Sequence, residues 1–301
     1  MLFRSRVEFT ISHNLLSGGF PVVGSANLTA FFERGYKIQR VDLSYNQLTG
    51  TIPALVAFIS SLRYADVSGN RLTGSLPVIE GIGGWKNLEY FAVADNQFTG
   101  TIPVGFSNSL TSLDASNNRL TGGFPLELYS KFPQLELIIL SNNPLGGRLS
   151  GLLGNLGALR DLHLSNCNLT GVIPDNLMGL RSLEHLLLDN NKIEGSIPPS
   201  MVYLTLLKEL DVSNNNLDGS LPFEIGSLTL LNLMSVANNS LTGSLPSSLE
   251  HLLALKKFDV SGNLFTGEVP DGICANLEVT TTMVGCDLKC DCCSLNTTTV
   301  C

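Results

Sequence analysis

The strongest constraint on the fold is a frame that returns eleven times along the 301 residues, L-x-x-L-x-L-x-x-N-x-L-x-G-x-I-P. Its polar slot recurs at intervals of 32, 24, 26, 22 and 25 residues, and then five times at 24. A glycine follows that slot by four positions in every turn, and a proline follows it by seven positions in ten turns. Self-similarity at a period of about 20–29 residues indicates one array of stacked units and not two globular domains.

The turn around Asn191 shows how the frame builds a strand and a core. Leu186 and Leu188 alternate with Leu187, so the first two face the core of a short parallel sheet and Leu187 faces solvent. Asn191 is then interior, and its amide must hydrogen-bond backbone groups of adjoining turns. The same reasoning predicts a structural ladder formed by Asn46, Asn70, Asn96, Asn118, Asn143, Cys167, Asn191, Asn215, Asn239 and Asn263.

The second half of each turn carries different signals. Gly195 and its equivalents suit a backbone position that needs positive φ or close approach, and Pro198 and its equivalents fix φ where the chain leaves the strand. Apolar residues then recur every three positions, as at Leu177, Leu180 and Leu183, which favours a short 3₁₀ segment. Strands on one side and tighter segments on the other predict a twisted, curved stack whose concave sheet is the default binding surface.

The frame closely resembles that of plant-specific leucine-rich repeat proteins, whose mark is the L-x-G-x-I-P extension seen at 169–174. The resemblance covers about residues 7–270. It implies an α/β solenoid, the leucine-rich repeat horseshoe: a right-handed superhelix with one concave parallel β-sheet and short 3₁₀ or helical segments on the convex side. Receptor kinases, receptor-like proteins and secreted enzyme inhibitors share this frame, so the fold selects no single activity.

The sequence predicts two regions, a solenoid over 1–270 and a Cys-rich C-terminal cap over 271–301. Six of the seven cysteines fall in the second region: Cys274, Cys286, Cys290, Cys292, Cys293 and Cys301. In an exported protein they would form disulfides, in a pairing that sequence cannot choose. A metal site and unpaired thiols are the alternatives, although adjacent cysteines without histidine fit zinc spacings poorly. The tail is similar to that of secreted or surface repeat proteins of diatoms and other algae.

The N-terminus predicts an incomplete chain. Phe9 and Ile11 already occupy core slots, so no capping segment precedes the first turn, and we expect the chain to begin inside a longer protein. No signal peptide and no apolar run of ~18 residues is present, so any membrane attachment would come through a segment absent from this chain. The expected location is extracellular or at the cell surface.

Composition and motifs narrow the function. A net charge of −8 disfavours nucleic acid and anionic membranes as partners. The catalytic motifs of hydrolases, metalloproteases, P-loop enzymes and kinases do not occur, which predicts a non-enzymatic chain without a cofactor. Four N-x-S/T sequons are candidate glycosylation sites: Asn27, Asn168, Asn238 and Asn296. Cys167 is expected to be a buried structural thiol in the ladder, with a redox role as the alternative.

Two groups of outward-facing residues are binding candidates on the concave sheet. Tyr64 and Tyr90 should be adjacent, with Asp42 and Asp66 beside them, and could stack on a sugar or anchor a peptide. A second group should form an apolar patch with two imidazoles: Leu137, Ile139, His163, His185 and Leu187. The alternatives are that neither group binds anything, or that the histidines hold a metal with Asp161 or Asp189, for which the spacing gives little support.

Two insertions, one within residues 22–36 and one at 81–85 that carries the only tryptophan, Trp85, are interpreted as tolerated drift, with a recognition role as the alternative. The sequence thus predicts a non-catalytic recognition module that binds a protein, peptide or glycan on its concave face. One alternative is the ectodomain of a membrane receptor-like kinase or receptor-like protein. Another is an inhibitor of a secreted glycan hydrolase, similar to polygalacturonase inhibitors. The oligomeric state is left open.

Overall fold

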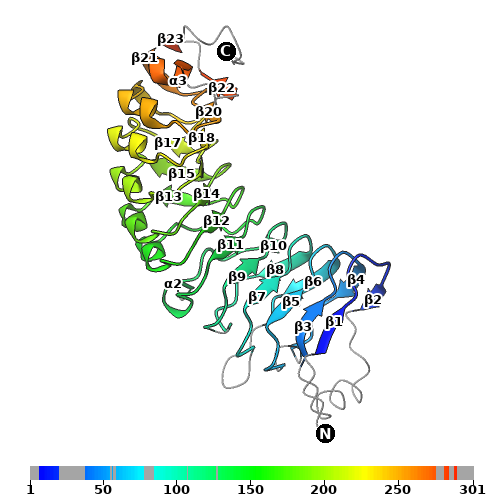
Figure 1. Ribbon diagram of the computed structural model, residues 1–301. Coiled ribbons are helices and arrows are strands. Elements are labelled where there is room, and N and C mark those ends of the chain that lie inside the picture. The colour runs from blue at the N-terminus through cyan, green and yellow to red at the C-terminus, as the bar shows by residue number, and fades with distance from the viewer. Residues whose placement is uncertain are drawn as a thin grey trace, which may run out of the picture. The chain divides into compact units, whose positions relative to one another are not determined.

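Figure 1 shows the computed structural model, which describes residues 7–19, 38–54, 56, 59–77, 85–106, 108–126, 128–275, 281–284 and 288–289. The chain divides into two compact units, Met1–Leu145 and Gly146–Cys301, called here the N-terminal and C-terminal units. Each unit is a stack of turns whose strands pair in parallel, which confirms the predicted solenoid. The sequence predicts a division only at 270/271, and that boundary stays a prediction.

The first sheet of the N-terminal unit takes one short strand from each turn. Its strands follow one another in chain order: β1 (Val7–Thr10), β3 (Ile38–Asp42), β5 (Tyr64–Asp66), β7 (Tyr90–Ala92), β9 (Ser112–Asp114) and β11 (Leu137–Ile139). In β5 and β9 the central residue is buried between two half-buried neighbours, and in β7 Tyr90 is half-buried while Phe91 and Ala92 are buried. Because the register joins equivalent residues of successive turns, outward side chains form rows across the sheet.

The first sheet of the C-terminal unit is built in the same way. Its strands are β12 (Asp161–His163), β14 (His185–Leu187), β16 (Glu209–Asp211), β18 (Leu233–Ser235), β20 (Lys257–Asp259) and β22 (Thr281–Met283). The register again joins equivalent residues, as in the pairs His185–Glu209 and Leu187–Asp211. Strand β22 pairs with β20, so parallel pairing continues past the last residue of the repeat frame, Pro270.

A second set of parallel strands follows the ladder slot in most turns, and the repeat frame does not predict it. In the N-terminal unit these strands are β2 (Ser17–Gly19), β4 (Gln47–Gly50), β6 (Arg71–Ser75), β8 (Gln97–Gly100) and β10 (Arg119–Leu120). In the C-terminal unit they are β13 (Thr170–Val172), β15 (Lys192–Gly195) and β17 (Asn216–Leu217), and then β19 (Thr242–Ser244), β21 (Leu264–Glu268) and β23 (Leu288–Lys289). Each turn therefore contributes to two ribbons of sheet.

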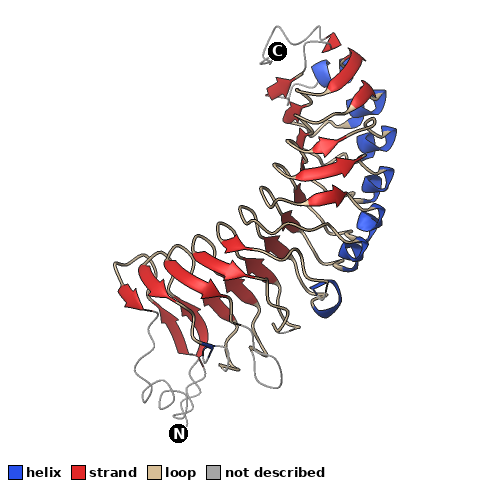
Figure 2. Cartoon of the chain, turned by 180° about the vertical axis from the view of Figure 1, so that it is seen from behind, coloured by secondary structure: helices blue, strands red, loops and turns tan. Residues whose placement is uncertain are grey.

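Short helices close the far side of the turns in the C-terminal unit, as Figure 2 shows. They are the 3₁₀ helices η2 (Gly151–Asn155), η3 (Asp175–Gly179), η4 (Pro199–Tyr203), η5 (Phe223–Ser227) and η6 (Ser247–His251), followed by the α-helix α3 (Asp271–Ala275). The three-residue apolar spacing predicted this, and Leu177 of η3 and Leu249 of η6 are buried. The N-terminal unit has one described helix, α2 (Leu128–Lys131).

The core of the N-terminal unit contains an aromatic cluster around Trp85, which is 3% exposed. Its ring centroid lies 5.0 Å from that of Phe91 and 6.0 Å from that of Phe106, and its Nε1 donates to the Val56 carbonyl at 3.1 Å. Trp85 is thus a packing residue and gives no support to a recognition role for this insertion, whose residues 81–84 lie outside the described residues. The insertion at 22–36 lies outside the described residues.

Within the described part of the chain, no helix is long and apolar enough to cross a lipid bilayer.

Candidate functional site

The outward face of the N-terminal unit carries a row of side chains from β3, β5, β7 and β9. Arg40 pairs in register with Tyr64, Tyr64 with Tyr90, and Tyr90 with Ser112. The Tyr64 and Tyr90 rings are stacked, with centroids 4.3 Å apart and planes 2° apart. The Arg40 guanidinium carbon lies 3.5 Å from the Tyr64 centroid, on a cation–π contact. We call Arg40, Tyr64 and Tyr90 the tyrosine column.

Burial and neighbouring carboxylates keep the tyrosines of the column neutral. Burial raises the pKa of Tyr90 well above its usual range, and the neighbouring Tyr64 adds to the shift. Burial also raises the pKa of Tyr64, with the Asp66 carboxylate contributing. The Tyr64 hydroxyl donates to Asp66 Oδ2 at 3.2 Å. Both tyrosines are half-buried, so the column is a rigid and partly accessible surface feature.

A parallel row of carboxylates runs beside the column, two residues further along each strand. Asp42 Oδ2 accepts from Arg40 Nη2 at 3.1 Å. Asp66 and Asp114 belong to the same row, which the alanine at position 92 interrupts. Asp114 Oδ1 accepts from the Ser116 amide at 3.0 Å and from its hydroxyl at 2.8 Å. Burial raises the pKa of Asp114, although the Ser116 bonds oppose the shift. The row makes this face acidic.

The outward face of the C-terminal unit carries the predicted histidines. His185 Nδ1 lies 2.5 Å from Asp161 Oδ1, and His163 Nε2 lies 4.0 Å from the same oxygen. The two imidazole rings meet edge to face with centroids 6.4 Å apart. Leu187, paired in register with His163, is half-buried beside them. The structure therefore brings three of the predicted patch residues together around Asp161.

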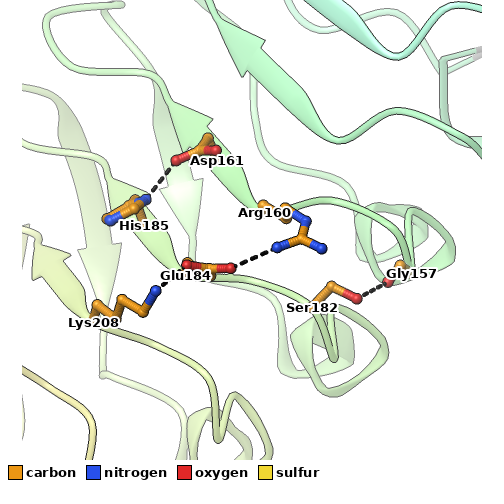
Figure 3. A network of polar contacts seen from close by, with 7 residues as sticks. All are labelled: Gly157, Arg160, Asp161, Ser182, Glu184, His185 and Lys208. Atoms are coloured by element: carbon orange, nitrogen blue, oxygen red, sulfur yellow. Dashed lines mark hydrogen bonds and ion pairs between the residues drawn. The ribbon is translucent and has the colours of Figure 1, made fainter.

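Two basic side chains share the Glu184 carboxylate at the rim of this face. Figure 3 shows Glu184 between Arg160 and Lys208, next to the contact between Asp161 and His185. Arg160 Nη1 lies 2.9 Å from Glu184 Oε1, and Lys208 Nζ bonds Oε2. The Lys208 hydrogen bond lowers the pKa of Glu184, and Arg160 contributes to the shift. Glu184 is thus paired with two basic side chains, whereas among the described carboxylates beside the tyrosine column only Asp42 has a basic partner, Arg40.

The other two residues of the predicted patch, Leu137 and Ile139, lie on β11 of the N-terminal unit and are half-buried. They therefore belong to a different unit from His163, His185 and Leu187. A single patch formed by all five residues stays a prediction.

The ladder asparagines bond successive turns. Asn191 Nδ2 donates to the carbonyls of Leu164 at 2.8 Å and Leu188 at 2.9 Å, and its Oδ1 accepts from the amides of Leu169 and Cys167. The side-chain amide also donates to a carbonyl of the preceding turn at Asn46, Asn70, Asn96, Asn118, Asn143, Asn215, Asn239 and Asn263. The Cys167 thiol is buried and donates to the Ser165 carbonyl at 3.5 Å.

A row that the repeat frame does not single out lies one residue before the ladder. Every residue there has positive φ: His13, Tyr45, Gly69, Asp95, Asn117, Asn142, Asn166, Asn190, Asn214, Asn238 and Gly262. The recurrence of Asn, Asp and Gly is the sequence signal for this conformation, because these residues tolerate it best. In the C-terminal unit, Asn238 Nδ2 donates to Asn214 Oδ1 at 3.0 Å, so part of the row forms an exposed amide ladder.

The remaining predicted positions are described only in part. Asn168 and Asn238 are exposed, while Asn27 and Asn296 lie outside the described residues. Cys274 belongs to α3, but its side chain is outside the description, as are Cys286, Cys290, Cys292, Cys293 and Cys301. The disulfides and the glycosylation therefore stay predictions. Across the described ranges, no three His, Cys, Asp or Glu side chains are grouped to hold a metal ion.

Comparisons with known proteins identify the repeat. Profiles of the leucine-rich repeat match residues 133–193 and 157–217, and others match residues 37–58, 109–130, 227–252 and 254–276. The search of curated proteins finds no match. Among solved structures, the chain resembles the leucine-rich repeat ectodomain of the Arabidopsis thaliana receptor kinase HAESA, solved with an extended IDA peptide hormone. The identity is 30% and the TM-score 0.80, over 92% of this chain and 49% of that one.

Two further structures set the range of functions. The ectodomain of the Arabidopsis thaliana receptor kinase GASSHO1/SCHENGEN3, solved with CASPARIAN STRIP INTEGRITY FACTOR 2, is 29% identical with a TM-score of 0.77, over 94% of this chain and 38% of that one. A plant ice-binding protein is 29% identical with a TM-score of 0.63, over 74% of this chain and 71% of that one. The chain thus spans half or less of the length of these two receptor ectodomains.

Proposed function

We propose that this chain, a leucine-rich repeat protein whose turns are similar to those of plant receptor ectodomains, is a non-catalytic module that recognises a peptide or protein. The observation that carries the proposal is the tyrosine column. It offers stacked aromatic rings held rigidly beside carboxylates, and rigid aromatic anchors dominate the energetics of recognition surfaces. The HAESA ectodomain, solved with a peptide hormone ligand, supports a peptide as the ligand class.

The location follows from the same comparison. Because those structures are ectodomains of membrane receptors, we propose that this chain works outside the cell or at its surface. It would serve as the sensing part of a receptor or as a secreted binder. A hydrolase inhibitor is the remaining alternative, in which the acidic face would meet a basic enzyme surface. Inhibition of a pectinase by the purified chain would favour that alternative.

The test is selection of ligands from a displayed library of random peptides on the immobilised full chain. Peptides that bind the wild type should lose at least about tenfold in affinity on a Tyr64→Ala/Tyr90→Ala variant, because a stacked anchor contributes about 1–2 kcal/mol. A His163→Ala/His185→Ala variant is the matched control in the other unit. Peptides that bind all three proteins equally would remove the tyrosine column as the recognition surface. A tenfold loss of affinity on the His163→Ala/His185→Ala variant, with no loss on the tyrosine variant, would place the recognition surface around the two histidines.

A second candidate function rests on a different surface. The second sheet of the N-terminal unit and the residues that directly follow its strands expose an array of seven hydroxyls: Thr49, Thr51, Thr73, Ser75, Thr99, Thr101 and Thr121. Arg71 and Arg119 are also exposed and pair in register with Thr49 and Thr99. The strands of this sheet lie ~4.8 Å apart, so the hydroxyls can hold water in an ordered layer. The ice-binding neighbour supports ice as the ligand of this array.

The shape of ice crystals grown with the protein tests this second function. Thr99→Lys, at the centre of the array, should abolish any shaping. Thr242→Lys, at the equivalent position of the C-terminal unit, should leave it unchanged, because Thr242 is not one of the seven hydroxyl residues. Crystals that grow as they do in buffer would exclude ice binding and leave peptide recognition untouched.

A further inference from the structure

The tyrosine column has an arginine beside one outer ring face and only a serine beside the other. On the β3 side, the Arg40 guanidinium covers Tyr64 and is bonded to Asp42. On the β9 side, the next position of the row is Ser112, whose side chain is too small to cover the Tyr90 ring. Among the described residues, the only ring stacked on Tyr90 is that of Tyr64. One face of Tyr90 is therefore left without a large neighbour on its own row.

The carboxylate row repeats at this second end. Ser112 and Asp114 occupy on β9 the positions that Arg40 and Asp42 occupy on β3. A planar cation placed above Ser112 would therefore meet a tyrosine face on one side and Asp114 two residues along the strand. Arg40 makes this pair of contacts at the first end, at 3.5 Å from the Tyr64 ring and 3.1 Å from Asp42.

The space above Ser112 suits a planar group. Leu137 of β11 pairs in register with Ser112 and forms the far wall. Tyr90 and Leu137 are two strands apart, which is roughly 9–10 Å in a sheet. The stacking distances within the column, 3.5 Å and 4.3 Å, show that a planar group occupies one strand step. A single guanidinium plane fits between the two walls.

We propose that the open face of Tyr90, above Ser112 and beside Asp114, binds the guanidinium of an arginine side chain carried by the peptide or protein ligand; this inference rests on the proposed function. Asp114 accepts from the Ser116 amide and hydroxyl, which are neutral donors, and no ion pair of Asp114 occurs among the described residues, so a cationic ligand group would be its first charged partner. Arginine is favoured over lysine because its flat guanidinium stacks on aromatic rings and bonds carboxylates with directed donors.

The direct test uses acetyl-arginine amide as the probe and NMR spectra of the full chain. Its addition should shift the signals of Tyr90, Ser112 and Asp114. Acetyl-citrulline amide, which keeps the shape and loses the charge, should bind about tenfold more weakly. Asp114→Asn should produce a similar loss with acetyl-arginine amide. Equal shifts with the two probes, or shifts only with a methyl glycoside, would overturn the assignment of a guanidinium site.

A filled-site variant gives an independent test. Ser112→Arg places a guanidinium where the ligand is proposed to bind, as Arg40 already stands over Tyr64, and should reduce acetyl-arginine amide binding at least about tenfold. Leu233→Arg is the matched control, because it is the equivalent position of the C-terminal unit and has Glu209 and Lys257, not tyrosines, as row neighbours. Circular dichroism verifies that both variants fold. Unchanged binding to Ser112→Arg would refute the proposal.

The selected peptides separate this inference from the proposed function. Peptides that depend on the tyrosine column and contain an arginine whose replacement by citrulline weakens binding would support both. Peptides that need the tyrosine column but bind equally well with citrulline in place of arginine would refute the guanidinium site. They would leave the proposed recognition function supported. Peptides whose binding does not depend on the column would remove it as the recognition surface, whatever the response to acetyl-arginine amide.

Discussion

Individual side chains in this protein act mainly between turns. Asn191 bonds three carbonyls and two amides of its own turn and the preceding one, so one residue ties two turns together. The interior place of these asparagines could be inferred from their 24-residue spacing. The positive φ of the residue before each one could not be inferred from apolar periodicity, because it depends on backbone sterics at a position that alternates among Asn, Asp, Gly, His and Tyr.

Asn191→Ala should lower the free energy of unfolding by about 3 kcal/mol, because several buried backbone groups lose their partners at once. Denaturation in urea measures the change through its midpoint. Asn190→Gly is the matched control: Asn190 is exposed at φ 56°, where glycine is unstrained, so the expected change is within about 0.5 kcal/mol. Equal losses in the two variants would contradict the ladder role of Asn191.

Tyr64 and Tyr90 should ionise at higher pH in the native protein than in the unfolded chain in a spectrophotometric titration, because burial raises the pKa of both. The native state keeps these phenols neutral while the unfolded chain ionises near pH 10. Their contribution to stability is therefore complete below about pH 10 and is lost as pH rises further, through the raised pKa values. Single-step ionisation of all tyrosines near pH 10 would show that the column is solvated.

At the scale of elements, the spacing of apolar residues predicts the first set of strands and the 3₁₀ helices, but it does not predict the second set of strands. The spacing of three at Leu177, Leu180 and Leu183 predicted η3 because apolar periodicity is a strong local signal. The second sheet escaped prediction because its strands are only two to five residues long and contain a glycine at positive φ, such as Gly195. Gly195 has the positive φ that the sequence predicts, and it also belongs to a paired strand, which the sequence does not predict.

The packing of η2 against η3 depends on two glycines. A Cβ on Gly179 would lie 2.1 Å from the Gly154 carbonyl oxygen, so Gly179→Ala should force the two segments apart and cost about 3 kcal/mol. Gly157→Ala is the control in the same unit, since the nearest atom to its Cβ is 3.7 Å away. Thermal unfolding of the two variants checks this, and a Gly179→Ala variant as stable as Gly157→Ala would contradict the contact.

At the scale of the whole molecule, the repeat frame predicts the architecture but not its division into two units. The frame runs through the boundary at Leu145 with spacings of 25 and 24 residues, so periodicity alone carries no mark of a division there. For the tyrosine column, the sequence predicts which residues are adjacent but not how their side chains are arranged. The neighbourhood of Tyr64 and Tyr90 follows from register, whereas the stacking of Arg40 and the opening above Ser112 depend on side-chain geometry.

Removal of one complete turn from the C-terminal unit should preserve its fold. Deletion of residues 192–215 joins Asn191 to Asn216 and keeps the frame and strand register of the remaining turns. The shortened protein should give a cooperative urea transition with a smaller m value, because less surface is exposed on unfolding. Deletion of only residues 204–215 breaks the frame and should give an unfolded or aggregated product, as measured by circular dichroism and gel filtration.

The constant 24-residue step also sets how a surface of this kind can evolve. Copying one step adds a strand, a helix and a ladder asparagine whose partners already exist in the flanking copies, so growth requires no compensating substitutions. New outward side chains then diverge while the interior remains fixed. Duplication of one turn within the gene therefore adds a complete set of outward-facing positions to the surface. Only these positions are free to change, because the core constrains the rest of each turn.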